Sequence, residues 1–216
     1  MNWKKKVFAD FSLYAVTDLY DEGPGIYKRV EAAYRGGADI IQLRSKTLSD
    51  AALFRIGIHF RRIADQFHKL FFVNDRPDLA LAVRADGVHL GQDDLPLSAA
   101  RRILRGKKVW VGRSTHSLEE AVAAMKEGAD YIGVGPIFKT PTKPAYRPVG
   151  LELIREVKRR IRIPFVCIGG IDQNNIHEVL EAGAGRAAVV RAVFGAANIY
   201  QATQILQEAI RRHAKE

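Results

Sequence analysis

Short apolar runs alternate with amphipathic stretches along this chain. Eight runs rich in Val, Ile, Phe and Tyr have the length of a β-strand, and the segments between many of them repeat apolar residues at helical spacing. We expect strands within residues 12–18, 39–46, 70–75, 87–92, 109–115, 131–136, 164–170 and 186–194. Clear helical patterns occupy residues 26–37, 51–68, 117–128 and 199–216.

Single residues mark where the predicted helices begin and end. Pro77 stands where a helix should start, and Ser117 followed by Glu120 has the pattern of a capping box. Glycine is typical just after a helix, because it adopts the left-handed backbone conformation without strain. Such glycines are Gly37, Gly106, Gly128 and Gly183.

Eight strand–helix units in one chain of this length predict a (β/α)8 TIM barrel. Several of the strands are apolar throughout, as expected when both faces are covered. A doubly wound open sheet is the alternative, but it usually has fewer strands and no GxGxxG motif follows the first one. With no linker or low-complexity segment, we expect residues 1–216 to form a single domain.

Composition narrows the class of protein. Apolar residues make up 47% of the 216 residues, which is enough for a sizeable core, and the one cysteine, Cys167, lies in an apolar run where it should be buried. No stretch approaches the length of a membrane span, and no cleavage site follows the basic first residues. We therefore expect a cytoplasmic protein that does not contact membranes.

The net charge of +10 indicates attraction for anions. Nucleic acid is one class of anionic partner, but the basic runs lie on separate predicted helices, are not interleaved with aromatic residues and carry no nucleic-acid-binding motif. We therefore expect small phosphorylated ligands and no nucleic acid.

Polar side chains gather at the carboxyl ends of the predicted strands, where barrels of this type place their active sites. Gln42, Arg44 and Lys46 alternate with Ile41, Leu43 and Ser45. Because a strand has a period of two, the three polar side chains share one face. That face should point into the mouth of the barrel.

Acidic and amide residues end the third and fourth strands. Asn74 and Asp75 follow one, and Asp93 and Asp94 follow the other. Oxygen ligands on adjacent loops suit Mg²⁺ held jointly by protein and phosphate. Asp93 and Asp94 could instead cap the following helix, but Asp75 beside them favours a metal.

The loop after the sixth strand is suited to binding phosphate. Thr140, Thr142 and Lys143 supply two hydroxyls and a cation, and Pro141 and Pro144 restrict the backbone. Residues 138–148 lack periodicity and are expected to form a mobile lid.

Further candidates follow the fifth, seventh and eighth strands. Gly169 and Gly170 can bring bare backbone N–H groups close to an anion, and Arg191 adds a cation. Ser114 and His116 end the fifth strand, and a lone loop histidine is more often structural than catalytic. The residues alone indicate one diphosphate or two phosphorylated groups and do not name a reaction.

Seven motifs together resemble the thiamine phosphate synthase family: "LYAVTD", "IQLRSK", "VND", "ADGVHLGQDD", "GRSTH", "GADYIGVGPIFKTPTK" and "IGGI". The resemblance runs from Leu13 to about Phe194. It implies coupling of hydroxymethylpyrimidine diphosphate to hydroxyethylthiazole phosphate, giving thiamine phosphate and diphosphate. The implied substitution is dissociative, through a pyrimidine methylene cation that the thiazole nitrogen captures.

The resemblance also implies roles for individual residues. Asp75 and Asp94 would hold Mg²⁺ on the diphosphate, which Arg44, Lys46, Asn74 and Lys143 would neutralise. Gln42 and Ser114 would contact the pyrimidine substrate or its diphosphate. Arg44, Lys46, Ser114 and Lys143 are the expected catalytic residues. The thiazole phosphate would be held by Thr140, Thr142, Gly170, the backbone at Val190, and Arg191.

Two departures and two alternatives accompany this hypothesis. Arg191 and Arg186 stand where the family commonly has a serine and a small residue, which puts the detail of the thiazole phosphate site in question. A thiazole tautomerase of the same fold would use His116 as a proton shuttle without metal. A non-catalytic barrel that binds phosphate or nucleic acid is the other alternative. Related barrels often pair, so a homodimer is possible.

Overall fold

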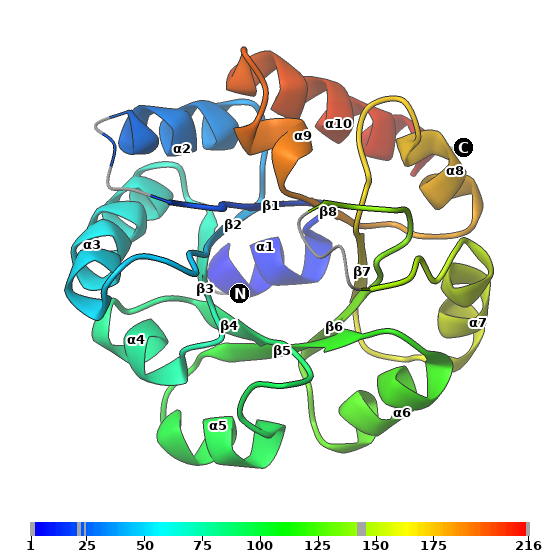
Figure 1. Ribbon diagram of the computed structural model, residues 1–216, viewed down its shortest axis with the longest axis horizontal. Coiled ribbons are helices and arrows are strands. Elements are labelled where there is room, and N and C mark those ends of the chain that lie inside the picture. Colours follow the sequence, from blue (N-terminus) through cyan, green and yellow to red (C-terminus); the bar gives the residue numbers. More distant parts are fainter. Residues whose placement is uncertain (1–2, 21–22, 24, 142–145, 215–216) are drawn as a thin grey trace.

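Eight parallel strands form a closed barrel in chain order, with helices around it (Figure 1). The computed structural model describes residues 3–20, 23, 25–141 and 146–214. The strands are β1 (Leu13–Val16), β2 (Ile40–Leu43), β3 (Leu70–Asn74), β4 (Gly87–Leu90), β5 (Trp110–Thr115), β6 (Tyr131–Val134), β7 (Phe165–Ile168) and β8 (Ala187–Val189). β1 pairs with both β2 and β8, which closes the barrel. The predicted TIM barrel is confirmed.

The described helices are α1 (Trp3–Asp10), α2 (Ile26–Arg35), α3 (Asp50–Gln66), α4 (Pro77–Ala82), α5 (Leu97–Ile103), α6 (Leu118–Lys126), α7 (Glu152–Arg160), α8 (Ile176–Glu181), α9 (Arg191–Phe194) and α10 (Ile199–His213). No helix in this part of the chain is long and apolar enough to cross a membrane. The assignment of residues 1–216 to a single domain stays a prediction.

The residues predicted to start and stop helices are confirmed in those roles. Pro77 is the first residue of α4, and the Ser117 hydroxyl accepts a hydrogen bond from the Glu120 N–H at 3.2 Å. The Glu120 carboxylate in turn accepts from the N–H of His116, one residue before the cap, at 2.7 Å. All four stop glycines have positive φ, and they are Gly37, Gly106, Gly128 and Gly183.

The eighth strand is shorter than the sequence predicted. It ends at Val189, and α9 begins at Arg191, within the range expected to be extended. Val190 between them has φ −108° and ψ −81°, which breaks the strand geometry. The turn places Val190 and Arg191 at the mouth of the barrel.

Alternation along the strands divides the core into two layers. Leu13 and Ala15 face the helices, whereas Tyr14 and Val16 face the interior of the barrel. Cys167 belongs to the outer layer, fully buried as expected, and burial raises the pKa of its thiol. The inner layer consists of Phe11, Tyr14, Val16, Ile40, Leu70, Phe72, Tyr131, Val166 and Ala188.

Helix α1, which the sequence pattern did not predict, covers the amino-terminal end of the barrel (Figure 1). Phe8 stacks on Trp110 at the start of β5, with ring centroids 4.3 Å apart. Lys4 forms an ion pair of 2.7 Å with Asp86, just before β4. The lower end of the barrel is thus closed by the chain's own first helix.

Arg186 belongs to this lower end and not to the phosphate site. Its guanidinium lies 5.1 Å from the Phe11 ring centroid and donates a hydrogen bond of 2.9 Å to the Ala9 carbonyl. Because parallel strands share one direction, a residue just before β8 lies opposite the mouth. The question that Arg186 raised about the thiazole phosphate site is therefore answered by its position at the opposite end of the barrel.

We predict that Gly112→Ala lowers the free energy of unfolding by about 3 kcal/mol, as expected for overpacking a core. A Cβ at Gly112 would lie 2.2 Å from Cζ of the buried Tyr131 ring. Urea denaturation measures the effect. Gly185→Ala is the control, because a Cβ there meets nothing within 4 Å. Equal stability of the two variants would contradict this packing.

Candidate active site

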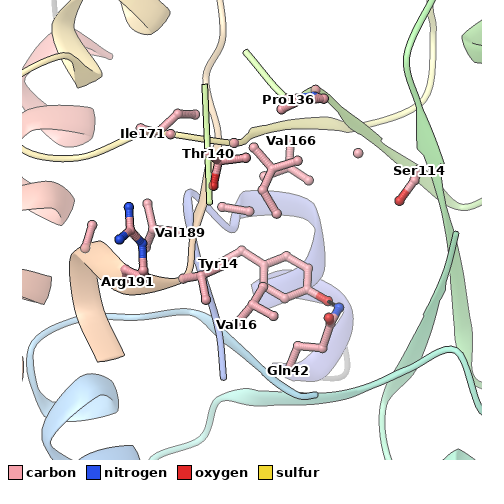
Figure 2. A pocket seen from close by; sticks show the side chains of 18 of the residues that line it. Tyr14, Val16, Gln42, Ser114, Pro136, Thr140, Val166, Ile171, Val189 and Arg191 are labelled. Atoms are coloured by element: carbon pink, nitrogen blue, oxygen red, sulfur yellow. Dashed lines mark hydrogen bonds between the residues drawn. The ribbon is translucent and has the colours of Figure 1, made fainter. Parts of the chain in front are cut away.

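A cavity of about 430 Å³ opens at the carboxyl ends of the strands (Figure 2). Every strand, or the loop that follows it, contributes to the lining. Tyr14, Val16 and Val166 form an apolar floor, while polar side chains occupy the walls. This is the position where a TIM barrel places its active site.

Most of the predicted substrate-binding residues line this one cavity. They are Gln42, Arg44, Asn74, Ser114, Thr140, Gly170, Val190 and Arg191. Lys46, Asp75 and Asp94 do not line it and form a cluster at the rim beside Asn74. Thr142 and Lys143 lie outside the described residues.

The rim cluster joins the ends of β2, β3 and β4. Lys46 Nζ lies 2.6 Å from Asp75 Oδ2, and the carboxyl groups of Asp75 and Asp94 are hydrogen-bonded to each other. The Asp75 N–H donates to the His89 carbonyl at 2.8 Å, and the Gly91 N–H donates to Asp94 Oδ2 at 2.6 Å. Two carboxyl groups that are separate in sequence are thereby held together by backbone contacts.

The pKa values of the two carboxyl groups move apart. Partial burial opposes ionisation of Asp75, but the hydrogen bond from Asp94 and the Lys46 ammonium outweigh it and lower the pKa of Asp75. Partial burial, followed by the neighbouring Asp75 carboxylate, raises the pKa of Asp94. The two carboxyl groups therefore differ in acidity, with Asp75 the more acidic of the pair, as expected for closely spaced carboxylates.

This pair fits a magnesium ion. Mg²⁺ takes one or two protein carboxylates and fills its remaining positions with water and phosphate oxygens. A divalent cation bound to Asp75 and Asp94 would offset the repulsion between the two ionised carboxylates. The part of the chain that the structure describes holds no cluster of three or more His, Cys, Asp or Glu side chains suited to a metal. The exposed Asp93 joins neither the pair nor the cap of α5, whose N-cap residue is Pro96.

Arg44 is held at the cavity wall by an acidic partner that the sequence did not single out. Its guanidinium forms an ion pair with Asp18, which follows β1, and both side chains are largely buried. The Thr17 hydroxyl accepts the Arg44 N–H at 2.9 Å and donates to the Gln42 carbonyl at 3.1 Å. The cation is thus fixed in place without a ligand.

Backbone contacts form the opposite wall, where Thr140 and Arg191 lie on one side of the cavity (Figure 2). Gly170 has φ +68°, and a Cβ there would lie 2.8 Å from the Lys139 carbonyl oxygen and 2.7 Å from Phe138 Cβ. Only glycine therefore allows the loops after β6 and β7 to pack so closely. Asn175 fixes this turn by donating to the Gly170 carbonyl at 2.8 Å.

His116 lines the cavity but is already engaged on one side. Its Nδ1 donates to the Gly135 carbonyl, and its ring lies 4.6 Å from the Tyr146 ring. Nε2 is buried and has no hydrogen-bond partner within the described residues. The ring supports the start of the loop that contains Thr140.

His89, Tyr14 and Tyr131 are polar residues of the interior that sequence reasoning missed. His89 Nε2 lies 2.9 Å from Ser114 Oγ, and Nδ1 lies 2.9 Å from the Tyr131 hydroxyl. The same period-two pattern that predicted Gln42 as inward-facing also applies to His89 in "GVHLG". The period-two pattern therefore already placed His89 inside the barrel, but the apolar residues around it made the strand resemble ordinary core.

Known proteins show which family this barrel belongs to. A family model described as thiamine monophosphate synthase matches residues 13–193. The chain belongs to the thiamine monophosphate synthase family. The thiamine-phosphate synthase of Shouchella clausii is 47% identical over 202 residues, covering 93% of this chain and 96% of that protein. That of Synechocystis is 46% identical, but this chain spans only 57% of its length.

Solved structures agree with the family. Thiamine phosphate pyrophosphorylase from Pyrococcus furiosus is 40% identical, with a TM-score of 0.86 and coverage of 94% of this chain and 97% of that one. A geranylgeranylglyceryl phosphate synthase from Thermoplasma acidophilum, 16% identical with a TM-score of 0.73, shows only the shared fold. The predicted activity of a thiamine-phosphate synthase, a transferase, is confirmed. The tautomerase-like and non-catalytic alternatives are not favoured.

Proposed function

We propose that the cavity binds hydroxymethylpyrimidine diphosphate and hydroxyethylthiazole phosphate and joins them into thiamine phosphate, releasing diphosphate. The observation that carries this proposal is the Asp75–Asp94 pair with Lys46 at one side of a cavity whose other side offers Thr140, Gly170 and Arg191. One side suits a metal-bound diphosphate and the other a single phosphate. The apolar floor between them suits two aromatic rings.

At the diphosphate side, Asp75 and Asp94 would hold Mg²⁺. When bound, this ion neutralises charge that develops on the leaving diphosphate. Lys46 leaves Asp75 to contact phosphate oxygens, because its side chain is 59% exposed and free to turn. Arg44 and Asn74 contact the same group from the cavity wall. We propose that Lys143 also contacts the diphosphate.

Bond cleavage in this proposal depends on electrostatics. The substitution is dissociative, so the protein mainly stabilises the departing negative charge, and fixed cations in a partly enclosed site do this without reorganising. Ser114 and Gln42 orient the pyrimidine ring. The thiazole nitrogen has its own lone pair, so no general base is required, in keeping with the engagement of His116 Nδ1 by Gly135.

The thiazole phosphate would bind at the wall opposite the metal. The Thr140 hydroxyl, the backbone at Gly170 and Val190, and the Arg191 guanidinium all line that wall. We assign Thr142 to the same phosphate. Arg191 replaces a hydroxyl donor with a cation, which binds phosphate by charge-assisted hydrogen bonds.

Other expectations stay predictions. These are a cytoplasmic location, no binding of nucleic acid or membranes, and a homodimer as the possible assembly.

The direct test incubates the chain with both substrates, with and without Mg²⁺, and detects thiamine phosphate. Asp75→Ala should lower the rate by at least about a hundredfold, since it removes a ligand of the ion that stabilises the leaving group. Asp93→Ala is the matched control, because this neighbouring carboxylate is exposed and outside the pair. Full activity of Asp75→Ala, or coupling that needs no Mg²⁺, would overturn the proposal.

A second test concerns the two unusual arginines. Arg191→Ser should raise KM for the thiazole phosphate about fivefold, as expected for an exposed charge pair worth about 1 kcal/mol, and should reduce the salt dependence of KM. Arg186→Ser should leave KM unchanged, because Arg186 lies at the closed end of the barrel. Steady-state kinetics at two salt concentrations measure both. If KM is the same for Arg191→Ser and for the unsubstituted protein, Arg191 does not bind the thiazole phosphate.

A further inference from the structure

A continuous chain of hydrogen bonds crosses the barrel along the bottom of the cavity, and four of its five members line that cavity. Ser114 Oγ lies 2.9 Å from His89 Nε2, and His89 Nδ1 lies 2.9 Å from the Tyr131 hydroxyl. The Tyr131 and Tyr14 hydroxyls are 3.2 Å apart, and Gln42 Nε2 donates to the Tyr14 hydroxyl at 2.6 Å. Five side chains from five strands are linked in this way.

The middle of this hydrogen-bond chain is buried in an otherwise apolar layer, whereas His89 and Ser114 are half-buried. Tyr131 is 0% exposed, Tyr14 2% and Gln42 3%, and their neighbours include Phe72 and Val166. Burial raises the pKa of both phenols, so each keeps its single proton near neutral pH. Polar groups in such a place cost free energy unless each is hydrogen-bonded, and phenylalanine would fill the same space without that demand. Their presence points to a role beyond packing.

Because each hydroxyl carries only one proton, the hydrogen bonds of this network can run in only one donor-to-acceptor order. The Gln42 amide donates to Tyr14, so the one proton of Tyr14 goes to Tyr131, and that of Tyr131 goes to His89 Nδ1. A neutral imidazole that accepts at Nδ1 carries its proton at Nε2, which donates to Ser114 Oγ. The reverse order would leave the Tyr14 proton without an acceptor among the described residues.

The two ends of the chain therefore present opposite polarity to the cavity. Ser114 already accepts from His89, so its own proton is available to a ligand. Gln42 lines the cavity and uses Nε2 to donate to Tyr14, which leaves Oε1 as the side-chain atom that can accept from a ligand. Figure 2 shows Ser114 and Gln42 on different sides of this space, with Gln42 bonded to Tyr14.

We propose that His89, Tyr131 and Tyr14 are positioning residues that fix this polarity and so make the site select an aminopyrimidine over an oxopyrimidine. The inference rests on the proposed function. An aminopyrimidine offers ring nitrogens that accept from Ser114 and an amino group that donates to the Gln42 oxygen. The oxo form has a ring N–H and a carbonyl instead, so its carbonyl would face the Gln42 oxygen, acceptor against acceptor, and its ring N–H would meet a Ser114 oxygen that already accepts from His89. Sites built on such hydrogen bonds reject mismatched ligands strongly.

The test uses the full-length protein and the same thiazole phosphate. It compares kcat/KM for the aminopyrimidine diphosphate with kcat/KM for its oxo counterpart. In Tyr131→Phe the imidazole loses its donor at Nδ1 and can take either tautomer, so Ser114 can donate or accept. The amino-to-oxo preference should fall by at least about tenfold, the value of one hydrogen bond. Tyr34→Phe is the matched control, because the buried Tyr34 hydroxyl donates to the Leu70 carbonyl at 2.8 Å and is not part of this hydrogen-bond network. Its preference should not change.

A second pair of variants keeps the inference testable if Tyr131→Phe does not fold. In His89→Gln the carbonyl can accept from Tyr131 while the amide donates to Ser114, so the preference should be kept. In His89→Leu it should be lost. Suppose the unsubstituted protein forms thiamine phosphate and Tyr131→Phe or His89→Leu has the same amino-to-oxo preference. That result overturns this inference and leaves the proposed function standing. No product from either pyrimidine overturns both.

Discussion

Closure of the barrel forces all inward-facing side chains to share one interior. Every second residue of eight strands points into that space, so large side chains at one level require small ones beside them. Gly112 makes room for the Tyr131 ring and Gly87 for Phe72, where a Cβ would lie 2.2 Å and 2.4 Å from ring carbons. The lower interior is filled in this way, and the space left above it becomes the active-site cavity.

Electrostatic pairing at the mouth follows from the same geometry. Because parallel strands end on one side, Asp18, Arg44, Lys46, Asp75 and Asp94 all meet there. Arg44 is paired with Asp18 and Lys46 with Asp75 before a ligand arrives. In the proposed reaction, substrate and metal would exchange with these existing partners, and the side chains that bind them would already be close to their working positions.

Most of the fold follows from residue patterns, because alternation and helix-stop glycines act locally. The inward placement of Gln42 and Arg44 could be derived from the period of β2 alone. Asp75 and Asp94 could be expected only as neighbours, since their hydrogen bond depends on backbone contacts with His89 and Gly91 that no local pattern reveals. Helix α1 was missed because it is short and basic and has no fully buried residue. His89 was missed because one polar residue in an apolar strand does not show which polar groups lie across the barrel.

The first helix also determines how ligands travel. With α1 and the inner aromatic layer filling the amino-terminal end, the cavity has its opening at the strand carboxyl ends. Whatever rests on the Tyr14 floor must then arrive before, and depart after, any molecule bound nearer the rim. How deep each molecule binds in the cavity thereby sets the order in which reactants enter and products leave.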